Sequence, residues 1–249
     1  MAFGQRGVNS DDTLRRMLSD FPFYARMCLM VRNKAGQVVP LILNPAQQEL
    51  HDRIEAHRER NRGLVRILGL KGRKQGFSTY VGGRGYWKTS LRKGVSAYIM
   101  THEQQATDAL FSIVDRYQRN NPLPPNVGAS NAKELVFDLL ESSYTVATAG
   151  QKAAGRGRDI TFFHGSEVAF WPNASTHFAA SIQAVPYEPG TEIILESTSN
   201  GTGGEWYERC QDAIAKRGDY ELVFIPWFMS PEYQREPEPG FELSDTSAE

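Results

Sequence analysis

The stretch Leu70–Thr79, LKGRKQGFST, combines glycines, cations and hydroxyls in a spacing that suits phosphate chemistry. It follows the apolar run LVRILGL and precedes a segment of helix-like composition. Phosphate binding needs successive backbone N–H groups that point inward and a helix N-terminus directed at the anion. Gly72 and Gly76 permit the backbone angles of such a loop, and Ser78 stands where a hydroxyl reaches Mg²⁺.

One position departs from the usual loop, because Phe77 stands where a lysine normally meets the β and γ phosphates. The stretch is then a site without its lysine, a site with a relocated lysine, or an ordinary basic turn. A loop that folds back on phosphate brings its first residues close, so Lys71, Arg73 and Lys74 can supply the cation. We interpret Lys71 as the replacement, and we expect Phe77→Lys to compensate partly for its loss. The expected nucleotide-binding set is Lys71, Gly72, Arg73, Lys74, Gln75, Gly76, Phe77, Ser78 and Thr79.

Short apolar runs elsewhere predict the sheet that positions this loop. They are rich in β-branched and aromatic residues and span 64–70, 95–100, 160–163, 191–197 and 220–226. Helix-like stretches at 103–119 and 203–217 separate some of them, and residues 134–149 are candidates for further strands. This alternation predicts an α/β fold with a mainly parallel central sheet flanked by helices. Ligands bind at the carboxyl ends of such strands, so the loops after 64–70, 160–163 and 191–197 are expected to converge.

Helix signals are clear before the loop and ambiguous after it. Asn44 and Pro45 predict a helix that begins there, with Asn44 as its N-cap. The segment after the loop contains Gly82, Gly83 and Gly85, each unfavourable in a helix by about 0.5–1 kcal/mol relative to alanine. Either this helix packs closely on the sheet or it is short.

Composition excludes several classes of protein. The chain has 249 residues, 40% hydrophobic and 23% charged, which suits a globular protein with a core. No apolar run approaches the roughly 18 residues that span a bilayer, and the N-terminus has no apolar signal region, so we expect no membrane association. Cys28 and Cys210 are isolated, which fits a reducing compartment, and the five histidines show no zinc-binding spacing.

Charge is unevenly distributed although the net charge is −1. Residues 58–93 contain eleven Lys or Arg and one acid, Glu59, whereas residues 232–249 contain six acids and one base, Arg235. A basic block in a near-neutral chain suggests a polyanionic ligand, either phosphates or nucleic acid. A solvated basic surface is the alternative.

Two further stretches, RGRDITFFHGSEVAFWP at 156–172 and ESTSNG at 196–201, resemble motifs of the large terminase subunit of tailed bacteriophages. That family's first motif often carries its lysine at the start of the loop and an arginine within it, which match Lys71 and Arg73. In the family's second motif, an apolar strand ends in Asp-Glu. Glu167 matches the catalytic glutamate, which orients and polarises the attacking water, whereas Ser166 replaces the Mg²⁺-associated aspartate.

The same resemblance implies roles for residues outside these two motifs. LNPAQ at 43–47 resembles the adenine-side element and makes Gln47 the candidate for base recognition, with Gln48 as the competitor. An arginine at about the offset of Arg156 reaches the nucleotide of a neighbouring subunit in the family, with Arg158 as the rival. The coupling motif, a polar turn after a strand, corresponds to Ser197, Thr198, Ser199, Asn200 and Gly201.

The resemblance covers roughly residues 40–230 and implies a P-loop NTPase of the RecA-like, additional-strand class (ASCE). Its cofactors would be ATP and Mg²⁺. Its activity would be ATP hydrolysis that drives viral double-stranded DNA into procapsids, in the host cytoplasm at the portal. Its partners would be DNA, the portal protein of the procapsid, the terminase small subunit and further copies in a ring. The expected organisation is an N-terminal adenine-side segment (1–60), an ATPase core (61–230) and an acidic tail (231–249) toward an absent nuclease domain.

Two other functions are compatible with these residues. One is a RecA-like helicase or DNA translocase, which the VAFWP element and the single motor core disfavour. The other is a non-catalytic nucleic-acid or assembly module with a degenerate nucleotide site, which Phe77 and Ser166 favour and Glu167 disfavours.

Overall fold

The computed structural model describes residues 10–131, 133–150 and 159–230 together with 233, 236, 238 and 240; of residues 10 and 181 only the backbone is described. Arg156 and Arg158, both candidates for a contact with a neighbouring subunit, lie outside the described residues. None of the helices in the described part combines the length and apolar character that crossing a membrane requires.

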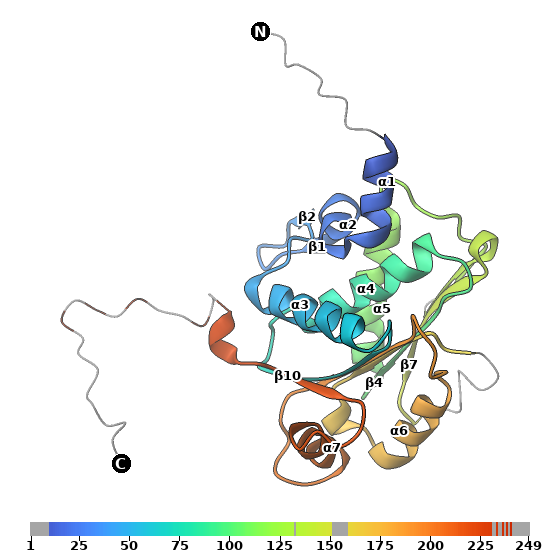
Figure 1. Ribbon diagram of the computed structural model, residues 1–249. Helices are drawn as coiled ribbons and strands as arrows, with labels where there is room; N and C mark the ends of the chain where they lie inside the picture. Colours follow the sequence, from blue (N-terminus) through green and yellow to red (C-terminus); the bar gives the residue numbers. More distant parts are fainter. Residues whose placement is uncertain are drawn as a thin grey trace.

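An eight-stranded sheet forms the centre of the molecule, in the order β10-β3-β9-β8-β4-β7-β6-β5 (Figure 1). The first six strands in this order are parallel, and β6 and β5 continue the sheet in antiparallel pairing. The predicted mainly parallel α/β fold is therefore confirmed. The strands are β3 (Val65–Lys71), β4 (Ser96–Thr101), β5 (Ala129–Asn131), β6 (Glu134–Phe137), β7 (Ser142–Thr148), β8 (Phe162–Ser166), β9 (Glu192–Ser197) and β10 (Glu221–Ile225).

Helices cover both faces of this sheet. One face carries α1 to α5, and Figure 1 shows the opposite face covered by α6 and α7. A separate two-stranded hairpin packs near the N-terminal helices. The elements of the first face are α1 (Ser10–Ser19), α2 (Phe21–Cys28), β1 (Met30–Arg32), β2 (Val38–Pro40), α3 (Pro45–Arg60), α4 (Phe77–Leu91) and α5 (Gln104–Asn120). The remaining helices are η1 (Asp138–Leu140), η2 (Val168–Phe170), α6 (Ala174–Gln183), α7 (Glu205–Ile214) and η3 (Trp227–Met229).

Two hydrophobic clusters correspond to the two faces. The larger cluster joins helices α2 to α5 to sheet residues such as Ile67 and Ile99. The smaller cluster joins α6 and α7 to residues such as Leu68 and Tyr98, which point the other way from the same strands. Strands buried on both faces explain the near-continuous apolar runs in the sequence.

The two helices that flank the loop begin as their sequences require. Helix α3 starts at Pro45, and its N-cap Asn44 forms a capping box with Gln47. Helix α4 runs without interruption through its three glycines, so the alternative of a short helix was wrong. A Cβ at Gly85 would lie 2.9 Å from the ring of Phe162, which shows that a glycine is needed for the helix to approach the sheet.

Candidate nucleotide-binding site

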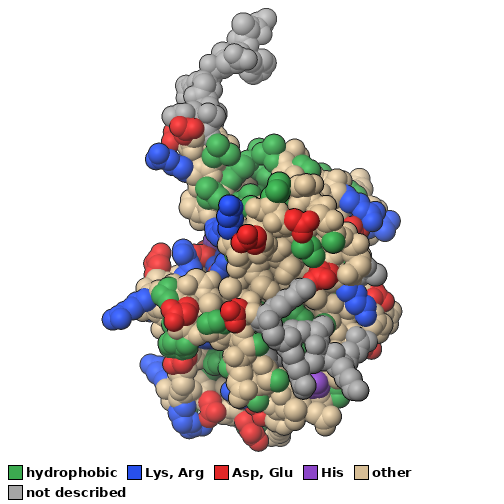
Figure 2. Space-filling model, turned by 90° about the vertical axis from the view of Figure 1, so that its right-hand side faces the viewer, with side chains coloured by type: hydrophobic (Ala, Val, Ile, Leu, Met, Phe, Trp, Pro, Cys, Tyr) green, Lys and Arg blue, Asp and Glu red, His purple; other side chains and the backbone are tan. Residues whose placement is uncertain are grey.

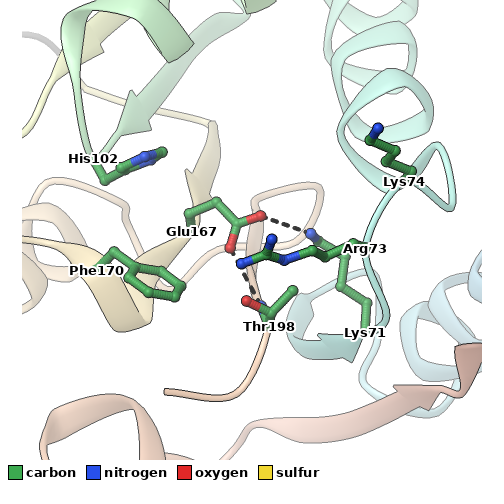
Figure 3. A pocket seen from close by; sticks show the side chains of 7 residues that line it. All are labelled: Lys71, Arg73, Lys74, His102, Glu167, Phe170 and Thr198. Atoms are coloured by element: carbon green, nitrogen blue, oxygen red, sulfur yellow. Dashed lines mark hydrogen bonds and ion pairs between the residues drawn. The ribbon is translucent and has the colours of Figure 1, made fainter.

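A cavity of about 340 Å³ opens at the carboxyl ends of the parallel strands (Figure 3). It lies where an open parallel sheet is expected to bind its ligand. Four strands contribute to it, since residues of the loop after β3, of the segments after β4 and β8, and of the turn after β9 all line it. The lining residues are Lys71, Arg73, Lys74, His102, Glu167, Phe170 and Thr198.

Lys71 is the last residue of β3, and its side chain is 7% exposed. Its Nζ lies 2.8 Å from Oε1 of Glu167 and 3.0 Å from Oε2 of Glu196. Burial disfavours the charge of the ammonium, but the two carboxylates outweigh burial and raise the pKa of Lys71 above its ordinary value. Lys71 is therefore a charged lysine at the inner end of the cavity.

Arg73 and Lys74, the other two loop cations, are exposed. Figure 3 shows Lys71 and Arg73 pointing toward Glu167, with Lys74 standing apart at the rim. Lys74 adopts a positive φ of 56°, in the left-handed region that non-glycine residues rarely occupy. The three candidates for the relocated lysine thus occupy three different environments.

Glu167 follows β8 directly and has left-handed backbone angles, φ 53° and ψ 48°. Non-glycine residues in this region are uncommon and cluster at functional sites. Its Oε1 pairs with Lys71, while its Oε2 accepts from the Ser197 hydroxyl and from the backbone N–H of Thr198, both at 3.3 Å. The carboxylate is thereby fixed at the floor of the cavity, between the loop and the turn after β9.

That turn corresponds to the predicted coupling motif at 197–201. The Ser197 hydroxyl also accepts a hydrogen bond from the backbone N–H of Ala169. The side-chain amide of Asn200 donates to the backbone carbonyl of Ala169. The structure therefore connects the turn to Glu167 and to the short helix that follows it. Ser199 and Gly201 are exposed.

Glu196 is a member of this site that the sequence did not reveal. It is fully buried on β9, and its Oε1 accepts from the hydroxyls of Ser78 (2.7 Å) and Ser166 (2.8 Å). Burial raises the pKa of this carboxyl, but His164, Lys71 and Ser78 outweigh burial and lower it to about 2. Glu196 is therefore an ionised carboxylate at neutral pH. Glu196 opens the stretch ESTSNG and ends the apolar run IILE, but nothing in the sequence pairs it with Ser78.

The loop itself is braced by two glutamines. Gln47 accepts from the backbone N–H of Asn44 and donates to the carbonyl of Gly76, so both ends of its amide are occupied. Gln75 accepts from the backbone N–H of Gly72 and donates to the carbonyl of Pro226 after β10. The role of Gln47 in base recognition stays a prediction, for which its amide retains one further hydrogen and one further lone pair.

Gly76 turns the chain into α4 with φ 75°, and within the described structure no side chain caps the first turn of this helix. The first N–H groups of α4 are thus directed into the loop without a side-chain acceptor, which is the arrangement that binds anions. Thr79 lies one residue beyond Ser78, and its carbonyl accepts from the Tyr117 hydroxyl.

Phe77 does not face the cavity. It is 4% exposed and belongs to the larger hydrophobic cluster. A Cβ on Gly69 would lie 2.2 Å from its ring, so the ring occupies the space that a side chain on β3 would otherwise fill. The expectation that Phe77→Lys compensates for loss of Lys71 was therefore poorly founded, because this side chain is directed into the core.

His102, Phe170 and His164 were also missed. His102 follows β4, and its ring lies 6.2 Å from that of Phe170 across the cavity. His164 is fully buried on β8, with Nε2 3.5 Å from Oε1 of Glu196, and neither of its ring nitrogens has a hydrogen-bond partner within the described residues. The rule that places ligands after parallel strands would have selected His102.

Comparison with known proteins identifies the fold. No protein-family model matches the sequence, and a search of curated proteins gives no match. Among solved structures, the HK97 bacteriophage large terminase matches 86% of this chain and 43% of its own length, with a TM-score of 0.64 and 14% identity. The large terminase ATPase domain of Thermus phage P74-26 matches 67% of this chain and 78% of its own length, with a TM-score of 0.51 and 17% identity.

A large terminase from a thermophilic bacteriophage, solved in complex with ADP, matches with a TM-score of 0.53 and 10% identity over 72% of this chain and 44% of its own length. The chain thus spans less than half the length of these two large terminases. It has the α/β fold of the ATPase domains of phage large terminases.

Proposed function

We propose that this chain binds and hydrolyses ATP as the motor domain of a phage large terminase. The observation that carries the proposal is the cluster in which Lys71 contacts both Glu167 and Glu196, and Glu196 contacts Ser78, beside a phosphate-loop-like turn. A cation, a hydroxyl and a fixed carboxylate at a helix N-terminus are the components that phosphoryl transfer requires.

In this proposal the nucleotide phosphates lie against the N-terminus of α4 and compete with the two carboxylates for Lys71. Movement of the ammonium to the phosphates would release Oε1 of Glu167, which is 2.8 Å from Nζ in the present structure. Glu167 would then accept a hydrogen bond from the attacking water, while Ser197 and Thr198 continue to orient its second oxygen. Arg73, exposed at the cavity, would offset charge on the transferring phosphoryl group.

The site also fits Mg²⁺. Within the described residues no three His, Cys, Asp or Glu side chains are grouped so that they hold a metal ion by themselves. A magnesium ion that is bound mainly by phosphate oxygens and water needs only one or two protein oxygens, and Ser78 is placed to supply one. When bound, the ion would neutralise charge on the β and γ phosphates.

The finer function follows from the resemblance of the motifs. We infer that hydrolysis drives double-stranded viral DNA through the portal into the procapsid, in a ring of identical subunits in the host cytoplasm, with the small subunit as a partner. The hydrogen bonds of Ser197 to Glu167 and of Asn200 to Ala169 support a path by which the state of the γ-phosphate reaches the rest of the molecule. Arg156, or Arg158 beside it, is the proposed contact with the neighbouring nucleotide.

ATP turnover by this chain, with Mg²⁺ and with a chelator, tests the proposal. We expect Mg²⁺-dependent release of phosphate, slow in the isolated domain if a neighbour completes the site. A chain that binds no nucleotide would support the alternative of a non-catalytic nucleic-acid or assembly module. A chain that unwinds duplex DNA would support the alternative of a helicase.

A further inference from the structure

The acid that accompanies a phosphate-loop hydroxyl is in an unusual place in this molecule. Mg²⁺ in P-loop NTPases is held by the loop Ser or Thr together with an aspartate at the end of a neighbouring strand. Position 166, at the end of β8, holds a serine instead. The loop hydroxyl of Ser78 nevertheless donates to a carboxylate, at 2.7 Å, and that carboxylate belongs to Glu196 on β9.

Sheet register accounts for this substitution. Ser166 and Glu196 are direct partners in the parallel pairing of β8 with β9, so their side chains leave the same face of the sheet side by side. The Ser166 hydroxyl donates to the same oxygen of Glu196 at 2.8 Å. On its other side Glu196 pairs in register with Gly69 of β3, which has no side chain to obstruct it. A glutamate is one methylene longer than an aspartate, and here it reaches the loop from the adjacent strand.

We propose that Glu196 replaces, one strand over, the metal-associated acid that position 166 lacks, and that it helps to fix Mg²⁺ beside Ser78 when nucleotide binds. This inference rests on the proposed function.

Hydrogen-bond geometry supports it, because a hydroxyl has one hydrogen to donate and two lone pairs. The hydrogen of Ser78 is committed to Glu196, so its lone pairs remain available to a cation. The orienting role is the one that carboxylates play behind the ligands of metal sites.

Charge supports it as well. Glu196 is 0% exposed, and its Oε2 is 3.0 Å from Nζ of Lys71, its nearest cation. If Lys71 moves to the phosphates, Glu196 is left as a buried charge without its partner, which is strongly unfavourable. A divalent cation beside Ser78 would restore the balance, so the ammonium and the metal would exchange places during nucleotide binding.

His164 provides a third observation. Both of its ring nitrogens are buried without a hydrogen-bond partner within the described residues, and Nε2 is directed at Oε1 of Glu196 from 3.5 Å. His164 is therefore a buried polar neighbour of the carboxylate on which the proposal depends.

The test measures metal and nucleotide binding by the 249-residue chain rather than turnover. Calorimetry gives ADP affinity with Mg²⁺ and with a chelator, and electron paramagnetic resonance gives Mn²⁺ affinity at saturating ADP. The variants are Glu196→Gln, Glu196→Asp and the double variant Ser166→Asp with Glu196→Gln, which returns the acid to β8. Glu221→Gln is the control. Glu221 is a glutamate on β10 of the same sheet, and it pairs with Arg53 and Arg60 of α3.

We expect Glu196→Gln to weaken Mn²⁺ binding by about 10–100-fold and to leave ADP affinity in chelator nearly unchanged. The double variant should recover much of the loss, and Glu221→Gln should match the native chain. Thermal unfolding identifies variants that do not fold. If Glu196→Gln fails to fold, weaker Mn²⁺ binding by Glu196→Asp, which keeps the charge, is the expected result.

Native Mn²⁺ affinity in every folded Glu196 variant would overturn the inference and leave the proposed function standing. Equal losses of ADP affinity with metal and with chelator would also overturn it, because they would show that Glu196 only holds Lys71 and Ser78 in place. Failure of the native chain to bind ADP under either condition would instead refute the proposed function, and this inference with it.

Discussion

Glu167 is the residue on which the proposed chemistry depends most directly. Its carboxylate is oriented by Lys71, Ser197 and Thr198, and an amide would retain the shape but lose the charge that polarises water. We expect Glu167→Gln to reduce turnover by about 10²–10⁴-fold while nucleotide binding changes little. Phosphate-release assays alongside calorimetry provide the measurement. Unchanged turnover would remove Glu167 from the mechanism.

The relocated lysine is tested by alanine variants at the three loop cations. Lys71 is buried between two carboxylates, whereas Arg73 and Lys74 are exposed. We expect Lys71→Ala to reduce both ATP affinity and turnover, because it removes the cation nearest Glu167. Arg73→Ala should reduce turnover more than affinity, and Lys74→Ala should have the mildest effect. A severe effect of Lys74→Ala alone would place the functional lysine elsewhere than proposed.

Phe77 is expected to behave as a core residue rather than as a substituted ligand. We expect Phe77→Lys to lower the free energy of unfolding by about 3 kcal/mol or more, because it replaces a buried ring with an ammonium. Phe77→Leu, which keeps an apolar side chain, should cost less. Denaturant unfolding of both variants provides the comparison. A stable Phe77→Lys chain that restores turnover to Lys71→Ala would show that position 77 does reach the phosphates.

At the scale of the elements, the strands and the sites that follow them could be predicted from the sequence because buried parallel strands have a simple apolar pattern. The run 64–70 corresponds to β3, and the run 191–197 corresponds to β9, each within one residue. Phe77 could not be interpreted in the same way, since its direction depends on Gly69, eight residues earlier.

Glu196 could not be selected either. Its position beside Ser78 depends on the register of β9 beside β8 and β3, which pattern and propensity do not specify. A polar residue within an apolar run is ordinarily interpreted as the end of a strand, and only the sheet order brings its carboxylate to Ser78. Residues that are adjacent along the chain could be predicted, whereas residues that are adjacent across strands required the structure.

Helix α4 is tied to the sheet by a buried ion cluster. Arg84 is 1% exposed and pairs with Glu192 at 2.7 Å and with Glu55 at 2.6 Å, and Lys88 pairs with Glu192 at 2.8 Å. Glu192→Gln would leave Arg84 short of a partner in the interior. We expect it to lower the free energy of unfolding by about 3–5 kcal/mol. Denaturant unfolding measures this, and a loss below about 1 kcal/mol would contradict it.

The same carboxylate predicts a dependence on pH. Burial raises the pKa of Glu192, but Arg84 and Lys88 outweigh burial and lower it well below its ordinary value of 4.5. A lowered pKa in the folded state means that the stabilisation is present above the unfolded pKa and is lost as pH falls below it. Between about pH 5 and 3, the native chain should therefore lose stability more steeply than Glu192→Gln. Equal slopes would show that this pair does not govern acid unfolding.

At the scale of the whole molecule, the basic block at 58–93 is divided between two ends of the sheet. Three of its residues, Lys71, Arg73 and Lys74, line the nucleotide cavity. Five others line a cavity of about 680 Å³ at the amino ends of the strands, namely Arg58, Arg84, Lys88, Arg92 and Lys93. On the face shown in Figure 2, basic and acidic side chains of the described residues are interspersed. The basic residues that suggested a polyanionic ligand therefore do not form a single surface.

This division leads us to predict weak, nonspecific and salt-dependent binding of duplex DNA by the isolated chain. Phosphate contacts release counterions, so the logarithm of the affinity should fall linearly with that of the salt concentration, by about 0.9 for each contact. Arg58 and Lys93 are exposed at the second cavity, and their combined replacement by alanine should reduce this slope by as much as about 2. Arg217→Ala, an exposed arginine on α7's side of the sheet that pairs with Asp212, is the control. Titrations of the chain with duplex DNA at two ionic strengths measure this dependence. An affinity that does not change with salt, or a strong preference for one duplex sequence, would count against the proposed motor.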